Sequence, residues 1–103
     1  MAHEMMVGLT VVDDAVYAQY RDAIAPLLRE HGGGFRYDFV VGEVLRSAAP
    51  HPINRVFAIG FTDRERCAAF FANPEYRAIK ERLFARAVTG TTILAAYDRD
   101  DAN

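Results

Sequence analysis

The chain has 103 residues, 51% of them hydrophobic and 25% charged, a balance typical of one folded globular domain. Its net charge of -2 comes from 14 acidic and 12 basic residues spread along the sequence, which argues against a nucleic-acid partner because phosphate backbones require a basic stripe. The single cysteine, Cys67, excludes an internal disulfide and favours the cytoplasm, and no stretch resembles a secretory signal or a membrane-spanning helix.

The first half of the chain predicts a strand, a helix and a second strand. Residues 5–12 form a short run rich in β-branched residues that ends at an aspartate pair suited to capping a helix. Apolar residues then recur at helical spacing as far as His31. Residues 35–45 alternate aromatic or apolar with charged residues, as in a strand, and residues 46–54 carry two prolines and predict a loop.

The second half repeats this order. Residues 55–61 predict a strand, and Thr62 lies three residues before Glu65, the spacing of a helix capping box. At Asn73 the pattern restarts, because Asn suits an N-cap and the following Pro74 suits the first position of a helix. Residues 89–97 predict the last strand. We therefore expect one domain over residues 1–97 and a flexible acidic tail over residues 98–103.

This order, βαββαβ, is that of the ferredoxin-like plait, an α+β fold with a four-stranded antiparallel sheet. Helices cover one face of such a sheet, yet here both faces are apolar, and the pattern does not decide which face meets the helices. One set contains Val7, Leu9, Phe57, Ile59, Phe61, Ile93 and Tyr97, and the other contains Met6, Gly8, Val40, Val56, Ala58, Leu94 and Ala96. We expect two chains to pack sheet against sheet as a homodimeric α/β barrel whose interior holds a small ligand.

Three segments resemble the bacterial family known as domain of unknown function 1330: YRDAIAPLLREHGG, NRVFAIGF and AAFFANPEYRAIKERLFARA. The matching positions are Tyr17, Tyr20, Pro26, Gly32, Gly33, Arg55, Phe61, Phe70, Asn73, Glu75, Tyr76 and Arg82. The chain departs from the family after the second strand, where Arg46 and Ser47 lead into a loop with extra proline and histidine. The resemblance implies a dimeric α/β barrel, in a superfamily that includes cofactor-free monooxygenases, muconolactone-isomerase-like proteins and stress-responsive proteins.

The glycine run, Gly32 to Gly34, follows a helix and precedes a strand. Phosphate-binding loops have the opposite order, with glycines before a helix whose N-terminal N–H groups meet the anion. We therefore interpret the run as a helix stop, in which one glycine takes the left-handed conformation. His31, in the last turn, is interpreted as a helix-end cap, with lining a ligand site as the alternative.

Charged residues near the second strand are the main candidates for a site. Arg36 and Asp38 lie two apart in a predicted strand, so they should share a face and either orient a polar ligand in the barrel or form an exposed salt bridge. Glu43 and Arg55 flank the 46–54 loop and form a second candidate pair at the barrel mouth.

Tyr17 and Tyr76 complete the candidate pocket, which comprises Arg36, Asp38, Glu43, Arg55, His31, Tyr17 and Tyr76. Their hydroxyls can reach a ligand, although aromatic residues at helical spacing more often belong to the core. Cys67 has no neighbouring histidine and fits an inert buried thiol. We find no catalytic triad or metal motif, and we expect no cofactor.

Two functional hypotheses follow. The first is a cytosolic homodimer that binds a small, partly aromatic or acidic metabolite, with cofactor-independent oxygenase- or isomerase-type chemistry. It predicts a cavity larger than about 300 Å³ that at least one of the charged candidates or His31 enters. The second is a non-catalytic protein-interaction or stress-related module whose barrel is filled by side chains.

Overall fold

The structure, a computed structural model, describes residues 1–100. Its elements in chain order are β1 (Ala2–Val11), α1 (Asp14–Glu30), β2 (Gly33–Val40), β3 (Arg55–Phe61), α2 (Arg64–Ala72), α3 (Pro74–Ile79), the π-helical turn η1 (Lys80–Phe84), α4 (Ala85–Ala87) and β4 (Val88–Arg99). None of the helices in this part of the chain has the length and apolar character needed to cross a membrane.

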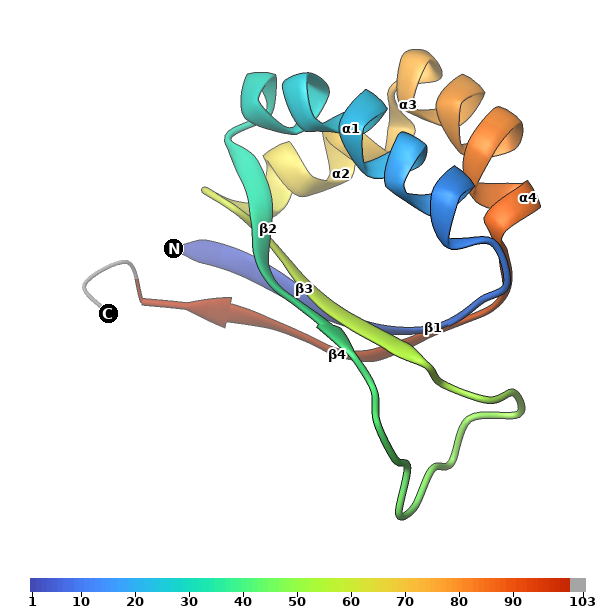
Figure 1. Cartoon of the computed structure of the whole chain (residues 1–103). Coiled ribbons are helices and arrows are strands. Elements are labelled where there is room, and N and C mark those ends of the chain that lie inside the picture. Colours follow the sequence, from blue (N-terminus) through green and yellow to red (C-terminus); the bar gives the residue numbers. More distant parts are fainter. Residues whose placement is uncertain (101–103) are drawn as a thin grey trace.

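The four strands form one antiparallel sheet in the order β2-β3-β1-β4. All helices lie on one side of it, and the segment between β2 and β3 extends away from the helix layer (Figure 1). This arrangement confirms the ferredoxin-like α+β fold predicted from the sequence. The helices pack on the face that carries Val7, Leu9 and Phe57, so most of the first apolar set faces the core.

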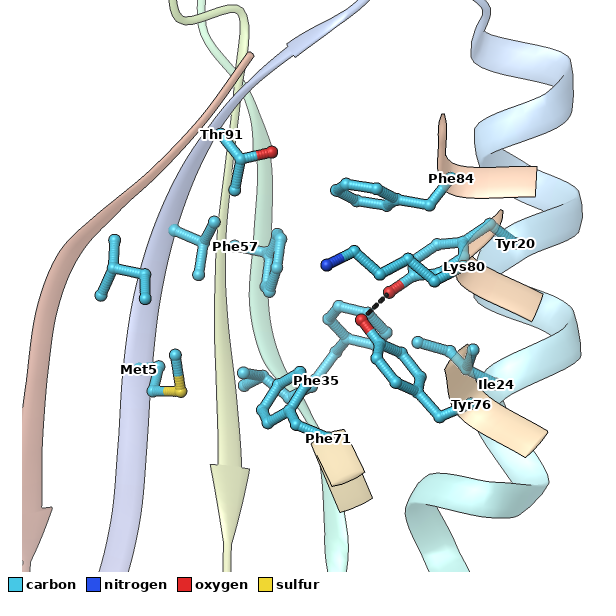
Figure 2. A pocket seen from close by; sticks show the side chains of 13 residues that line it. Met5, Tyr20, Ile24, Phe35, Phe57, Phe71, Tyr76, Lys80, Phe84 and Thr91 are labelled. Atoms are coloured by element: carbon cyan, nitrogen blue, oxygen red, sulfur yellow. Dashed lines mark hydrogen bonds between the residues drawn. The ribbon is translucent and has the colours of Figure 1, made fainter. Parts of the chain in front are cut away.

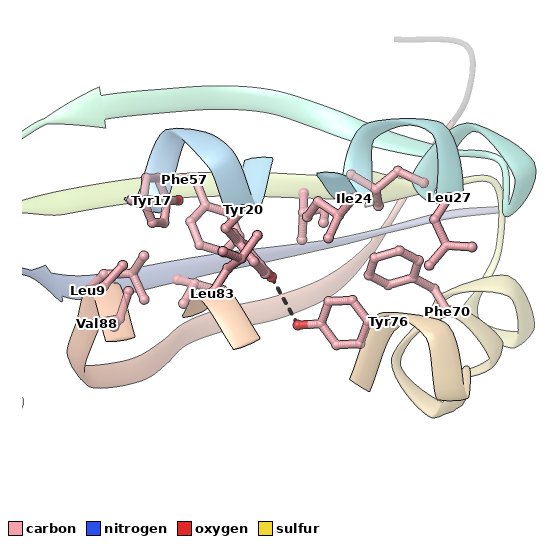
Figure 3. Packing of buried hydrophobic residues seen from close by; sticks show 14 of the residues in the cluster. Leu9, Tyr17, Tyr20, Ile24, Leu27, Phe57, Phe70, Tyr76, Leu83 and Val88 are labelled. Atoms are coloured by element: carbon pink, nitrogen blue, oxygen red, sulfur yellow. Dashed lines mark hydrogen bonds between the residues drawn. The ribbon is translucent and has the colours of Figure 1, made fainter. Parts of the chain in front are cut away.

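A cluster of buried side chains joins the two layers. Aromatic rings dominate its centre, where the ring centroids of Phe70 and Tyr76 are 4.5 Å apart (Figure 3). The ring of Phe70 also lies 5.6 Å from that of Phe61. Leu9 and Ile24 are almost completely buried from opposite layers. Burial of such side chains supplies most of the free energy that holds α1 and α3 on the sheet.

A β-bulge in β2 overturns the predicted facing of that strand. Phe35 pairs with Ile59 and Tyr37 pairs with Ala58, which leaves Arg36 as an extra residue. Phe35 therefore packs against the core, whereas Tyr37 is exposed on the opposite face. The prediction that the alternating aromatic residues share one face was wrong, because counting every second residue assumes an unbroken ladder.

A second bulge lies in β4. Val7 pairs with Ile93 but Met6 pairs with Ala95, so Leu94 is the extra residue. Beyond it the facing reverses. Tyr97, predicted to lie with Val7 on one face, instead lies on the uncovered face, opposite Glu4.

Several predicted element boundaries differ in the structure. The strand expected over residues 35–45 spans Gly33–Val40, and α2 is capped by Asp63 rather than Thr62, since the Asp63 carboxylate accepts a hydrogen bond from the N–H of Arg66. Asn73 caps α3 as predicted. β4 continues through residues 98–99, the start of the expected 98–103 tail, and the last three residues of that tail lie outside the described part of the chain.

The glycine run ends α1 as predicted. Gly32 follows the C-cap residue His31 and has a φ of +66°, and its N–H donates to the carbonyl of Arg29. A Cβ at this position would also lie 2.8 Å from Oγ1 of Thr62. The left-handed backbone and the close contact both exclude larger side chains here.

We expect Gly32→Ala to lower the free energy of unfolding by roughly 1–2 kcal/mol, because alanine is disfavoured in the left-handed region and meets Thr62. Gly34→Ala is the matched control, since a Cβ there meets no atom within 4 Å. Urea denaturation of both variants measures the difference. Equal losses would contradict the assignment of Gly32 as the obligatory glycine.

Candidate functional site

A cavity of about 440 Å³ lies between the helices and the sheet. Figure 2 shows side chains entering it from both layers. From the helices come Tyr20, Ile24, Phe71, Tyr76, Lys80 and Phe84; from the sheet come Met5, Val7, Phe35, Phe57, Ile59, Thr91 and Ile93. This volume lies within the range of small-molecule sites, and the lining is mostly aromatic and aliphatic.

Two buried tyrosines supply the cavity with hydroxyl groups. The hydroxyls of Tyr20, from α1, and Tyr76, from α3, form a hydrogen bond of 3.0 Å. Burial is the largest cause that raises the pKa of both groups, and for Tyr20 the neighbouring Tyr76 raises it further. Both tyrosines are therefore protonated at neutral pH, and each can act as a hydrogen-bond donor.

Lys80 adds a positive charge to the same wall. Its ammonium group lies 5.9 Å from the centre of the Phe84 ring, and Figure 2 shows it pointing from the helix layer toward the sheet. Lys80 begins the π-helical turn, in which the N–H of Ala85 donates to the carbonyl of Lys80, five residues back. Such turns are rare and occur often at functional sites.

The predicted site residues fall into separate places. Tyr17, Asp38 and Arg55 do meet, on the helix side of β2 and β3, together with Arg21 and Asp14, and we call these five residues the Asp38 cluster. Asp38 forms ion pairs with Arg21 at 2.8 Å and with Arg55 at 3.6 Å. Arg55 also pairs with Asp14 at 3.5 Å and lies 4.8 Å from the centre of the Tyr17 ring.

None of the residues in the Asp38 cluster lines the 440 Å³ cavity. The cluster holds α1 to the edge strand β2, and it adjoins the cavity through Arg21, whose guanidinium lies 5.5 Å from the centre of the Phe35 ring. The hydroxyl of Tyr17 is buried and has no hydrogen-bond partner within residues 1–100. We therefore interpret the Asp38 cluster as structural.

Arg36 lies on the opposite face of the sheet. Its Nε is 2.6 Å from Oε1 of the buried Glu4, which also accepts a hydrogen bond from the hydroxyl of Tyr97. The prediction that Arg36 and Asp38 share a face and pair was therefore wrong, and the bulge at Arg36 is the reason.

Glu43 and His31 also lie away from the cavity. Glu43 does not pair with Arg55, contrary to prediction, because it is exposed in the loop beyond β2 while Arg55 turns toward Asp38. His31 caps α1 as expected, since its Nδ1 donates to the carbonyl of Leu27 at 2.9 Å. Of the seven candidates, only Tyr76 lines the cavity.

The uncovered face of the sheet carries a shallower groove of about 810 Å³ beneath the loop. Glu43, Val56 and Leu94 are among its lining residues, and Ile93 lines both this groove and the cavity. Large apolar side chains are exposed beside it: Tyr37 is 51% exposed, Phe39 55% and Leu94 45%. Apolar side chains are therefore exposed on both edge strands of this face, β2 and β4.

The last part of the loop is fixed to this face. The ring of His51 bonds to the hydroxyls of Thr10 at 2.9 Å and Thr92 at 2.8 Å, from the two neighbouring strands β1 and β4. Asn54 continues the attachment, because its side-chain amide both donates to and accepts from the backbone of Val11 at 2.8 Å. The loop is therefore an ordered part of the uncovered face.

Tyr20 and Lys80 were missed as site residues, whereas Tyr76 was among the seven candidates. Tyr20 and Tyr76 are 56 residues apart, and nothing local in either segment indicates their contact. Lys80 was not among the candidate residues. Its spacing of four residues from both Tyr76 and Phe84, and its position as the only lysine in the sequence, were the available signals.

The family described as a domain of unknown function (DUF1330) matches residues 5–97. No curated protein matches the sequence.

Among solved structures, a protein of unknown function from Rhodopseudomonas palustris is 14% identical, with a TM-score of 0.76 over 97% of this chain and 83% of that one. A dimeric protein of unknown function with a ferredoxin-like fold from Bacteroides fragilis is 16% identical, with a TM-score of 0.59 over 95% and 96%. A protein from Nitrosomonas europaea, provisionally named an antibiotic biosynthesis monooxygenase, is 17% identical, with a TM-score of 0.55 over 95% and 89%. At these identities the likeness shows the fold alone.

We expect the stability of the protein to fall as the pH rises from 10 to about 12. Burial, followed by the charge of Asp38, raises the pKa of Tyr17 from 10.0 to about 12. The unfolded chain loses this proton above pH 10 while the folded chain retains it, so unfolding is favoured across this window. Tyr17→Phe has no hydroxyl proton to lose at this position. Its free energy of unfolding should therefore fall less between pH 10 and 12 than that of the wild type, by an amount on the order of 1–2 kcal/mol. Parallel pH profiles in urea denaturation would contradict this assignment.

Proposed function

We propose a function for this chain, which belongs to the DUF1330 family: it binds a small, partly aromatic metabolite in the cavity between helices and sheet, as a homodimer joined through the uncovered sheet faces. The observation that carries the proposal is the cavity itself. Six of its lining side chains are aromatic, and its polar groups, contributed by Tyr20, Tyr76, Lys80 and Thr91, are few. An apolar pocket with a few convergent polar groups is the usual form of a small-molecule site.

The polar groups of the cavity also suit the oxygenase- or isomerase-type chemistry expected for this fold. Such a reaction passes through an enolate or phenolate ligand with negative charge on its oxygen, and the proton lost from the ligand goes to solvent water, since the cavity lining has no carboxylate or imidazole to accept it. The Lys80 ammonium and the protonated hydroxyls of Tyr20 and Tyr76 can stabilise that charge as donors. An oxygenase would then use O₂ as co-substrate, whereas an isomerase would return the proton elsewhere on the ligand.

Homodimerisation is supported by the uncovered face of the sheet. Tyr37, Phe39 and Leu94 are exposed on it, and burying them against a second copy would remove apolar surface from water. The Bacteroides fragilis protein of this fold is described as dimeric. The cytoplasm remains our proposed location, supported by the single cysteine, Cys67.

The alternative function, a non-catalytic interaction module, is distinguished by ligand binding. We expect at least one compound in a panel of small aromatic metabolites to raise the melting temperature by a few degrees, since a ligand that binds only the folded state stabilises it. Thr91→Trp, which fills the cavity from β4, should abolish the rise, and Thr89→Trp, an exposed position on the same strand outside the cavity lining, should preserve it. A flat response across the panel would favour the interaction module.

The dimer is tested separately. We expect Phe39→Asp to convert the protein to a monomer in sedimentation at micromolar concentration. Burying an unpaired carboxylate between two apolar sheets costs a free energy of roughly several kcal/mol, which disfavours the dimer. Val12→Asp is the matched control: Val12 is 59% exposed, close to the 55% of Phe39, but lies in the turn between β1 and α1. A wild-type monomer would overturn the proposed assembly.

A further inference from the structure

Lys80 is an exposed residue that lines the cavity and forms no ion pair among residues 1–100. Arg21, Arg36 and Arg55 each form an ion pair with a carboxylate, whereas Lys80 forms none and has only the ring of Phe84 as a cation contact. It is also the only lysine in the sequence. The compact ammonium of lysine carries three donors and suits a single oxygen or a carboxylate.

The tyrosine pair leaves a second donor beside this charge. Two hydroxyls carry two protons, and the hydrogen bond between Tyr20 and Tyr76 uses one of them. The remaining proton has no acceptor among residues 1–100. Figure 2 shows both phenol oxygens on the same wall of the cavity as the Lys80 ammonium, facing the sheet. Three groups therefore offer donors to one region of the cavity.

The cavity lining contains no negatively charged group to pair with these donors. Its lining includes no carboxylate and no side-chain amide, and Thr91 is the only other residue with a side-chain oxygen. The opposite wall, from the sheet, is formed by apolar side chains such as Met5, Phe57 and Ile59. A complementary ligand therefore has an electron-rich oxygen at one side and a flat apolar body at the other.

The π-helical turn favours the same interpretation. It widens the helix between Lys80 and Phe84, the two residues of η1 that line the cavity. A turn of this type is rare, and turns of this type occur often at functional sites. Its position at Lys80, the charged residue of the cavity wall, therefore favours a role for this wall in binding.

We propose that the ligand class is small planar aromatic compounds with an anionic oxygen, a carboxylate or an ionised phenol or enol, bound at that oxygen by Lys80 and the Tyr20–Tyr76 pair. This inference rests on the proposed function, since it specifies the ligand of the same cavity. The aromatic body lies against the sheet wall, among Phe35, Phe57 and Ile59.

Cinnamate and cinnamamide provide a matched pair of probes, because they share a planar aromatic body and differ in the charge of the head group. We expect cinnamate to bind about tenfold more tightly than cinnamamide in isothermal titration, the size of one hydrogen bond to a charged group. In Lys80→Met this preference should fall to roughly twofold or less, because cinnamate loses more affinity than cinnamamide when the positive charge is removed. Arg82→Met is the control for loss of an exposed positive charge on the same helical segment outside the cavity lining, and it should retain the preference.

The single lysine gives an independent measurement. Isotope-labelled reductive methylation keeps the positive charge of Lys80 and yields one lysine signal beside that of the amino terminus. Cinnamate should shift the lysine signal more than cinnamamide. Equal binding of both probes in wild type and Lys80→Met would overturn the anionic-oxygen inference and leave the cavity function intact, whereas failure of both probes to bind, together with a flat metabolite panel, would overturn both.

Discussion

One extra residue in an edge strand determines the two surfaces of this protein. The bulge at Arg36 turns Phe35 toward the helices, where it forms part of the cavity wall, and turns Tyr37 and Phe39 toward the uncovered face. Without it, either Phe35 would leave the core or Asp38 would lose Arg21 and Arg55, since a shift of one residue reverses every side chain on one side of the shift. The cavity and the exposed apolar face thus depend on the same irregularity.

The order of the elements follows from local patterns in the sequence. The Asn73 and Pro74 restart, the glycine stop after α1 and the alternating strands each depend on neighbours within a few residues, so they could be predicted, and the family resemblance agreed with them. The bulges could not be predicted in this way, because the extra residue is defined by pairing with a distant strand. Because the bulge at Arg36 was not predicted, Arg36 and Asp38 were incorrectly expected to lie on the same face and to pair.

The candidate site was harder to predict for a related reason. Charged residues are conspicuous in a sequence, but here they form ion pairs that hold the elements together. Asp38 pairs with Arg55, and Arg36 pairs with Glu4. The cavity is built instead from residues whose spacing first indicated a core. Tyr20 and Tyr76 belong to the buried cluster and at the same time present hydroxyls to the cavity, a dual role that only their position in space reveals.

Ile93 connects the two surfaces, because it lines both the cavity beneath the helices and the groove on the uncovered face. A ligand that moves the Ile93 side chain would change the surface on which a second copy packs. In the same way, a second copy that moves Ile93 would change the space available to a ligand. Thermodynamic linkage then makes the two effects equal: any factor by which association changes ligand affinity is the factor by which the ligand changes association. The apparent affinity for a ligand would in that case vary with protein concentration.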